Sequence, residues 1–263
     1  MMDSKTRRTI IAERLRVEGE ASIVDLAELF GTSAMTIRRD LEILEGDGLA
    51  RRARGGAISV QSRSFEPPIL QRASHQAEAK RRIGIAAAEL VRENETVVLD
   101  VGTTVQEMAK ALREDFVLTA ITSSLLIATE LAAKPRVRTI VTGGVVRHGE
   151  MSLVGPRARA SFDDLNCDAV FLGVAGLSDA RGLTEYNLDD ADVKRAAMAS
   201  ARRKIVLADA SKLGQVALVT FAPASQIDLL VTDAPAENDV VRRLRDLDVE
   251  VLHVQPSEKE MTP

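Results

Sequence analysis

The clearest chemical signal in the sequence is a short run of small and polar residues at the end of an apolar segment. Asp100, Gly102, Thr103 and Thr104 close the apolar run 96–100 and open a segment with helical periodicity. Glycine lets the backbone turn tightly, and the threonines offer hydroxyl groups. The first turn of a helix adds free N–H groups and the positive end of its dipole. This combination is suited to binding a phosphate group.

Two further apolar runs end in the same way. Thr122, Ser123 and Ser124 follow one of them, and Gly143 and Gly144 follow the next. Each run alone is also typical of an ordinary turn or helix cap. Because ligands bind at the carboxyl ends of parallel strands, the convergence of these runs predicts a single site at one edge of a sheet.

Candidate partners for the same site follow later strands. Gly173 and Gly176 come after another apolar run, and Lys212 comes after the one that follows it. Between them lie Glu185, in a loop, and Lys194, on a segment with helical periodicity. Lys212 is a candidate partner for the phosphate. Glu185 and Lys194 are candidates for contacting sugar hydroxyls or shaping the pocket, although helical lysines more often face solvent.

A second chemical signal lies near the N-terminus, on a predicted helix that follows Ser33. Ile37, Leu41 and Leu44 are spaced four and three residues apart and form its apolar face. Polar and basic side chains project from the first turns of the other face, where a helix that enters a major groove reads base edges. The residues predicted to contact DNA on this helix are Ser33, Met35, Thr36, Arg38 and Arg39.

Three more arginines lie in a predicted hairpin over residues 49–60. Arg51, Arg52 and Arg54 surround a turn at Gly55 and Gly56. We expect them to contact phosphates or the minor groove. The whole chain has a formal net charge of −4, so a basic surface for DNA has to be local.

These residues divide the chain into two predicted domains. Residues 1–60 are expected to form three helices and a hairpin, which is a winged helix-turn-helix, and residues 61–76, which contain Pro67 and Pro68, a linker. Residues 77–255 are expected to form a larger α/β domain. Its strands are predicted as continuous apolar runs at 96–100, 116–121, 138–141, 169–173, 204–208, 227–232 and 249–254. Such runs are typical of a mostly parallel sheet covered on both faces.

Other kinds of chemistry find little support. The single cysteine, Cys167, cannot form an internal disulfide or a cysteine-based zinc site. His75, His148 and His253 lack the spacing of metal ligands, so we expect no metal and no cofactor. We find neither an apolar run long enough to span a membrane nor a signal peptide, and we expect a cytoplasmic protein.

The N-terminal segment resembles the DeoR family of bacterial sugar-metabolism regulators. The resemblance is carried by residues 35–41, Leu44, Gly48 and the Arg-Gly-Gly-Ala run 54–57. The resemblance covers nearly the whole chain and departs from the family pattern at Arg54, where histidine is more usual. It implies a C-terminal domain similar to ribose-5-phosphate isomerase and glucosamine-6-phosphate deaminase. It further implies that a phosphorylated sugar or polyol, held by residues 100–104, 122–124 and Lys212, weakens binding to operator DNA.

The resulting hypothesis is a repressor of a sugar or polyol catabolic operon that binds double-stranded operator DNA as a dimer or tetramer. One alternative is an isomerase-like enzyme fused to a DNA-binding domain. It is disfavoured because the related isomerases carry an acidic loop where this chain has Gly173-Val174-Ala175-Gly176. The other alternative is a regulator that senses a protein partner instead of a metabolite.

Overall fold

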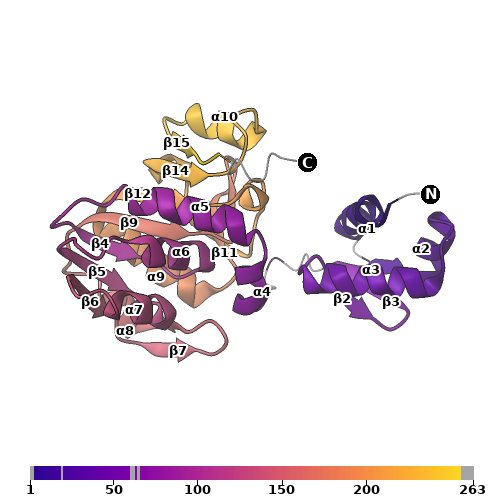
Figure 1. Ribbon diagram of the computed structural model, residues 1–263, viewed down its shortest axis with the longest axis horizontal. Helices are drawn as coiled ribbons and strands as arrows, with labels where there is room; N and C mark the ends of the chain where they lie inside the picture. Colours follow the sequence, from indigo (N-terminus) through magenta and orange to yellow (C-terminus); the bar gives the residue numbers. More distant parts are fainter. Residues whose placement is uncertain (1–2, 19, 60–62, 64–65, 256–263) are drawn as a thin grey trace. The chain divides into compact units, whose positions relative to one another are not determined.

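The computed structural model describes residues 3–18, 20–59, 63 and 66–255. The chain divides into two compact units, residues 1–75 and 76–263 (Figure 1). The predicted linker 61–76 contains a short helix at 69–74, and Pro67 and Pro68 precede this helix instead of interrupting it. Residues 60–62, 64 and 65 of the predicted hairpin and linker lie outside the described residues.

The first unit is a winged helix-turn-helix. Its elements are α1 (Ser4–Glu18), β1 (Glu20–Ser22), α2 (Ile23–Leu29), α3 (Ala34–Gly46), β2 (Ala50–Ala53), β3 (Gly56–Ser59) and α4 (Ile69–Ser74). Strands β2 and β3 form the predicted hairpin, and β1, which the sequence did not predict, adds an antiparallel edge to β3. Ile37, Leu41 and Leu44 of α3 are buried against Ile11 and Leu15 of α1 and so confirm the predicted apolar face.

The second unit is built on a seven-stranded sheet in the order β15-β14-β12-β9-β4-β5-β6, and every neighbouring pair is parallel. The strands are β4 (Thr96–Leu99), β5 (Leu118–Thr122), β6 (Val137–Val141), β9 (Cys167–Gly173), β12 (Ala201–Leu207), β14 (Leu229–Thr232) and β15 (Glu250–His253). All seven predicted strands are therefore found. The chain runs outward from β4 through β5 and β6, then returns to β9 and runs outward in the other direction. The order of the strands thus reverses between β4 and β9.

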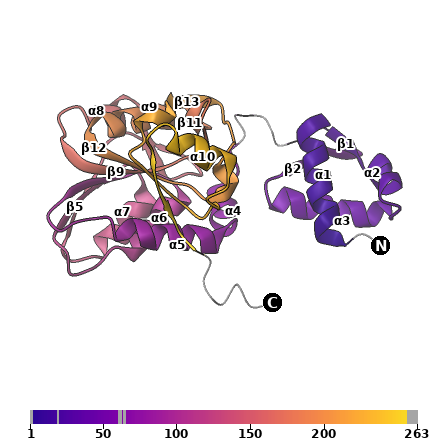
Figure 2. The ribbon, with the colours of Figure 1, turned by 90° about the horizontal axis from the view of Figure 1, so that it is seen from above.

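Helices cover both faces of this sheet (Figure 2). They are α5 (Ala77–Ala88), α6 (Thr103–Ala111), α7 (Leu125–Ala132), α8 (Pro156–Ala160), α9 (Leu188–Ala199) and α10 (Asp239–Arg245). Alternate residues of one strand point to opposite faces: Val97 and Leu99 pack with α5, α6 and α7, whereas Val98 packs with the core that contains α8, α9 and α10. Burial on both faces explains the continuous apolar runs.

Several short antiparallel strands were not predicted. A hairpin joins β7 (Val145–Arg147) and β8 (Ser152–Val154), and a second sheet joins β10 (Gly176–Ser178), β11 (Gly182–Glu185) and β13 (Val219–Ala222). Two 3₁₀ turns, η1 (Ala210–Lys212) and η2 (Ala224–Gln226), complete the unit. The second sheet and the hairpin both contact α9, and both contribute residues to the site described next.

The separate cores lead to a prediction about stability. Leu41 is fully buried in the core of the first unit, and removing a buried leucine side chain costs about 2–5 kcal/mol. Tyr186 is the only tyrosine, the chain has no tryptophan, and Tyr186 belongs to the second unit. In denaturant unfolding of Leu41→Ala, we expect a lower midpoint for part of the far-ultraviolet circular dichroism signal and an unchanged midpoint for tyrosine fluorescence. Equal shifts in both signals would contradict two independent cores.

Candidate functional site

The predicted phosphate loop lies where the strand order reverses. Asp100 follows β4, and Gly102 is the N-cap of α6 with φ of 124°, a backbone conformation that favours glycine. Gly173 ends the neighbouring strand β9, and a Cβ atom there would lie 2.8 Å from the carbonyl oxygen of Val101. The two strand ends therefore approach closely only because Gly173 has no side chain. Crevices at such reversal points bind ligands in parallel α/β sheets.

A buried lysine ties these two strand ends together. Lys194, on α9, has 1% of its surface exposed. Its Nζ donates to the Asp100 carboxylate and, over 2.9 Å, to the carbonyl oxygen of Gly173, and lies 3.4 Å from Oε2 of Glu185. An ammonium group has three donors, and three acceptors surround this one. Lys194 therefore links the ends of β4 and β9 to Glu185, and its role in shaping an effector pocket stays a prediction.

The environment of this cluster shifts its pKa values. Burial raises the pKa of the Asp100 carboxyl above its ordinary value, and the charge of Lys194 opposes that rise. Burial alone would lower the pKa of Lys194, but the charges of Asp100 and Glu185 together raise it. Lys194 is thus charged, and its charge compensates the carboxylates around it.

A second ion pair, which the sequence did not reveal, borders the cluster. Arg147 at the end of β7 lies 2.9 Å from Oδ2 of Asp190 on α9. Burial raises the pKa of Asp190, and the charge of Arg147 opposes that rise. The sequence gives no local signal for Arg147, because a lone arginine in a three-residue strand has no periodicity that marks it.

The other predicted residues on this edge have local structural roles. Thr122 Oγ1 accepts from the N–H of Ser124 over 3.0 Å, and Ser124 Oγ caps α7 by accepting from the N–H of Ile127 over 3.2 Å. Ser123 is buried beside them, and its carbonyl oxygen accepts from the N–H of Leu153 over 2.7 Å. These hydroxyls shape the loop after β5, which neighbours β4.

The predicted glycines after β6 and β9 also pack closely. Gly144 has φ of 128°, and a Cβ atom there would lie 2.6 Å from the carbonyl oxygen of Val154, whereas a Cβ atom on Gly143 would have its nearest contact at 3.7 Å, with Cβ of Arg157. A Cβ atom on Gly176 would lie 2.4 Å from the carbonyl oxygen of Gln215. Lys212 is half-buried in η1, directly after β12. The strands that precede these residues are consecutive in the sheet, in the order β6, β5, β4, β9, β12.

The residues predicted to read DNA lie on α3. Ser33 caps this helix by accepting from the N–H of Thr36 over 3.2 Å. Met35, Arg38 and Arg39 are exposed. The opposite side carries Asp40, which is 3% exposed. It pairs with Arg7 of α1 over 2.6 Å and lies 3.6 Å from Arg8, which fixes α3 against α1.

The three arginines of the wing differ in their contacts. Arg51 and Arg54 are exposed, and within the described ranges of the chain no ion pair involves them. Arg52 pairs with two glutamates of α3, Glu45 over 2.7 Å and Glu42 over 2.8 Å. Its charge is therefore already compensated inside the protein.

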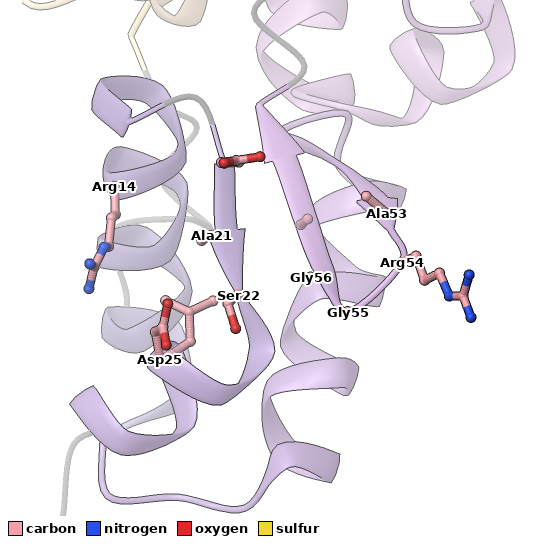
Figure 3. Close-up of a pocket in the computed structure, with 11 residues that line it drawn as sticks. Arg14, Ala21, Ser22, Asp25, Ala53, Arg54, Gly55 and Gly56 are labelled. Atoms are coloured by element: carbon pink, nitrogen blue, oxygen red, sulfur yellow. The ribbon is translucent and has the colours of Figure 1, made fainter.

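A pocket of about 460 Å³ opens beside the wing, between α1, the start of α2 and the turn from β2 to β3 (Figure 3). Arg14 and Arg54 line it together with the carboxylates of Glu20 and Asp25. Figure 3 shows Arg54 extending away from Asp25. Because charges of both signs line this pocket, it offers no net positive charge to a phosphate.

The described part of the chain offers neither a metal-binding cluster nor a membrane-spanning helix. It contains no group of three or more His, Cys, Asp or Glu side chains that could hold a metal ion. None of its helices combines the length and apolar character needed to cross a membrane.

The first unit is a winged helix-turn-helix with an exposed, arginine-bearing helix, and the second is an α/β unit with a candidate site where its strand order reverses. This combination is typical of a ligand-responsive DNA-binding regulator. Residues 7–63 match the DeoR-like helix-turn-helix domain, and residues 75–234 match the DeoR C terminal sensor domain. The chain belongs to the DeoR family of transcriptional regulators.

Relatives of known name agree with this assignment. The HTH-type transcriptional regulator GlpR of Haloferax volcanii is 35% identical over 91% of this chain and 93% of its own length. The Glycerol-3-phosphate regulon repressor of Escherichia coli K12 is 32% identical over 93% of this chain and 97% of its own length. These relatives are regulators and not enzymes, which confirms the prediction of a regulator.

Ribose 5-phosphate isomerase A from Methanocaldococcus jannaschii matches with a TM-score of 0.40 and 16% identity, over 52% of this chain and 55% of that one.

Replacing Lys194 tests its role in the site. Lys194→Met leaves Asp100 and Glu185 without their buried cation, and breaking a buried pair costs about 3–5 kcal/mol. We expect that loss in the free energy of unfolding, measured by denaturant titration with tyrosine fluorescence. The control is Lys110→Met. Its 2.7 Å pair with Glu107 is 45% exposed on the lysine side, and such pairs contribute about 0–1 kcal/mol.

The stability lost in Lys194→Met should also depend on pH. Without Lys194, the pKa of Asp100 rises further above its ordinary value of 3.8. A group with a higher pKa in the folded state binds more protons there, so stability falls as pH rises. The difference in free energy of unfolding between Lys194→Met and the wild type should thus be smallest near pH 3.8, the ordinary pKa of the carboxyl. It should grow as pH rises through the raised pKa of Asp100. A difference that does not change with pH would mean that burial of the Asp100 charge is not its cause.

Proposed function

We propose that this protein represses a sugar or polyol catabolic operon and that a phosphorylated sugar or polyol releases it from operator DNA. The E. coli relative is named for a glycerol-3-phosphate regulon, which supports an effector of this class. The match of residues 75–234 to the DeoR C terminal sensor domain supports an effector-binding role for the second unit.

The observation that carries the proposal is the start of α6 at the strand reversal. This helix has nine residues, and its N-cap, Gly102, provides no side-chain cap. The first N–H groups of a helix have no partners within it, and they attract phosphate together with the helix dipole. We assign the phosphate to Gly102, Thr103 and Thr104, with Lys212 as a further cation. In this assignment, Asp100, Glu185 and Lys194 set the position of that loop.

The DNA side of the proposal rests on α3. Arg38 and Arg39 are exposed on its first turns, next to Thr36 and Met35, and arginine binds guanine O6 and N7 with two hydrogen bonds. Helix-turn-helix proteins bind two half-sites as dimers, so we propose a homodimer or a tetramer as the active form.

A thermal-shift screen tests the effector class. The purified protein is heated with hexose, pentose and polyol phosphates, among them glycerol 3-phosphate, and with the unphosphorylated compounds as controls. A ligand at about a hundred times its Kd stabilises the native state by ~2.7 kcal/mol. For a domain of this size, that corresponds to a rise in Tm of roughly 5–10 °C. We expect this rise with at least one phosphate and no rise with its unphosphorylated counterpart.

The variant Lys212→Ala should show a smaller rise with the same phosphate and unchanged operator binding, whereas Lys110→Ala should behave as the wild type. If no phosphate in the panel changes the Tm, the proposed effector class is wrong. Cross-linking would then test the protein-partner alternative.

A substitution on α3 tests the DNA-reading residues. Arg39 is exposed, so Arg39→Ala should leave the fold and the effector-induced rise in Tm intact. Loss of a two-hydrogen-bond contact to a base costs about 1–3 kcal/mol. We therefore expect specific operator binding, measured by fluorescence anisotropy, to weaken by about tenfold to a hundredfold. A variant with wild-type affinity and footprint would remove Arg39 from the reading surface.

A further inference from the structure

The contacts of Arg52 set it apart from the other arginines of the wing. Its Nε donates to Oε2 of Glu45 over 2.7 Å, and its Nη1 donates to Oε1 of Glu42 over 2.8 Å. Its backbone N–H donates to the other oxygen of Glu45 over 2.9 Å. These hydrogen bonds lower the pKa of Glu45 and raise that of Arg52. Strand β2 is thus fastened to the last two turns of α3.

The same turn of α3 is held from its other side by α4. Gln71 Nε2 donates to the carbonyl oxygen of Glu45 over 2.8 Å and also to that of Gly46. Gly48 lies against this side chain, where an added Cβ atom would be 3.5 Å from Gln71 Nε2 and 3.5 Å from Pro67 Cγ. The last carbonyl groups of a helix need partners from outside it, and Gln71 provides one.

Helix α4 is itself anchored to the segment before it. Arg72 Nε donates to the carbonyl oxygen of Pro67 over 2.9 Å, and its Nη2 lies 3.1 Å from Glu66. Helix α4 ends at Ser74, and the sensor unit begins at residue 76. The chain that leads to the sensor is therefore attached to the C-terminal turn of the recognition helix.

Charge argues against a phosphate contact by Arg52. Two carboxylates face one guanidinium, so the group carries a local charge of −1, which repels DNA phosphates. We propose that Arg52, Glu42, Glu45 and Gln71 form a wing clamp: Arg52 positions the wing against the recognition helix and leaves phosphate contact to Arg51 and Arg54, and α4 acts on the wing through Gln71. This inference rests on DNA binding by the helix-turn-helix and requires no particular effector.

The first test compares Arg52→Ala with Arg51→Ala in the full chain. The probes are a duplex selected by the wild-type protein from random sequences and an unrelated duplex, each titrated at several KCl concentrations. Each phosphate contact contributes about 0.9 to the slope of log K against log salt. We expect Arg51→Ala to reduce the slope by about that amount. Arg52→Ala should keep the slope and lower the ratio of specific to non-specific affinity by roughly twofold to a hundredfold, the range that coupled contacts span.

Glu45→Gln should lower this ratio as Arg52→Ala does, and the double variant should lose no more than either single variant. The opposite pattern would overturn the clamp: a reduced slope for Arg52→Ala, and tighter specific binding by Glu45→Gln because it frees Arg52. The pairs involved are half-exposed and contribute little to stability. Circular dichroism checks that each variant is folded, and Arg52→Gln replaces Arg52→Ala if that variant is not.

The role of α4 is tested by two substitutions at one position. Gln71→Glu keeps the shape of the side chain but turns its donor into an acceptor that faces two carbonyl groups. Gln71→Lys keeps a donor. We expect Gln71→Glu to lower the affinity ratio with no further loss when combined with Arg52→Ala, and Gln71→Lys to retain most of it. If Gln71→Glu keeps the wild-type ratio of specific to non-specific affinity, or if the losses in the double variant add, then α4 does not act on the wing through Gln71. That part of the proposal would then be wrong.

Discussion

The sensor unit depends on one buried ammonium group. Strands β4 and β9 are neighbours, but the chain leaves them in opposite directions, and in parallel α/β sheets ligands bind at such reversal points. Lys194 reaches this point from α9 and joins Asp100 after β4 to the last carbonyl group of β9. Asp100 lies two residues before Gly102, so the lysine also fixes the loop from which α6 begins. An unpaired charge there would be costly, and this cost ties the geometry of the loop to the packing of α9.

The DNA-binding unit uses a buried charge in the same way. Asp40 lies on the inner face of α3, among the apolar residues that pack against α1, and Arg7 and Arg8 of α1 compensate it. This pairing, together with Ile37 and Leu41, sets the rotation of α3 about its axis. Arg38 and Arg39 are exposed as a result, on the side away from α1.

The C-terminal turn of α3 is where the reading helix, the wing and the chain toward the sensor meet. Glu45 contributes its carboxylate to Arg52 and its carbonyl oxygen to Gln71. A displacement of α4 therefore acts on the same residue that positions the wing. Regulation requires a coupling free energy between the effector site and the DNA-binding surface. This turn provides a continuous path of hydrogen bonds between α4 and the wing.

The sequence by itself determined the family, the two-unit organisation and the elements of both cores. The seven parallel strands and the apolar face of α3 follow from periodicity, because burial on one or both faces repeats along the chain over short distances. Only the tertiary structure decided the short strands β10, β11 and β13, the helix α4 inside the expected linker, and the partners of the charged residues. Lys194 and Asp100 are 94 residues apart in sequence, and Gln71 lies 26 residues after Glu45. Periodicity records which face of an element is buried, but the choice of charge partners depends on which elements pack together, and that information is not local.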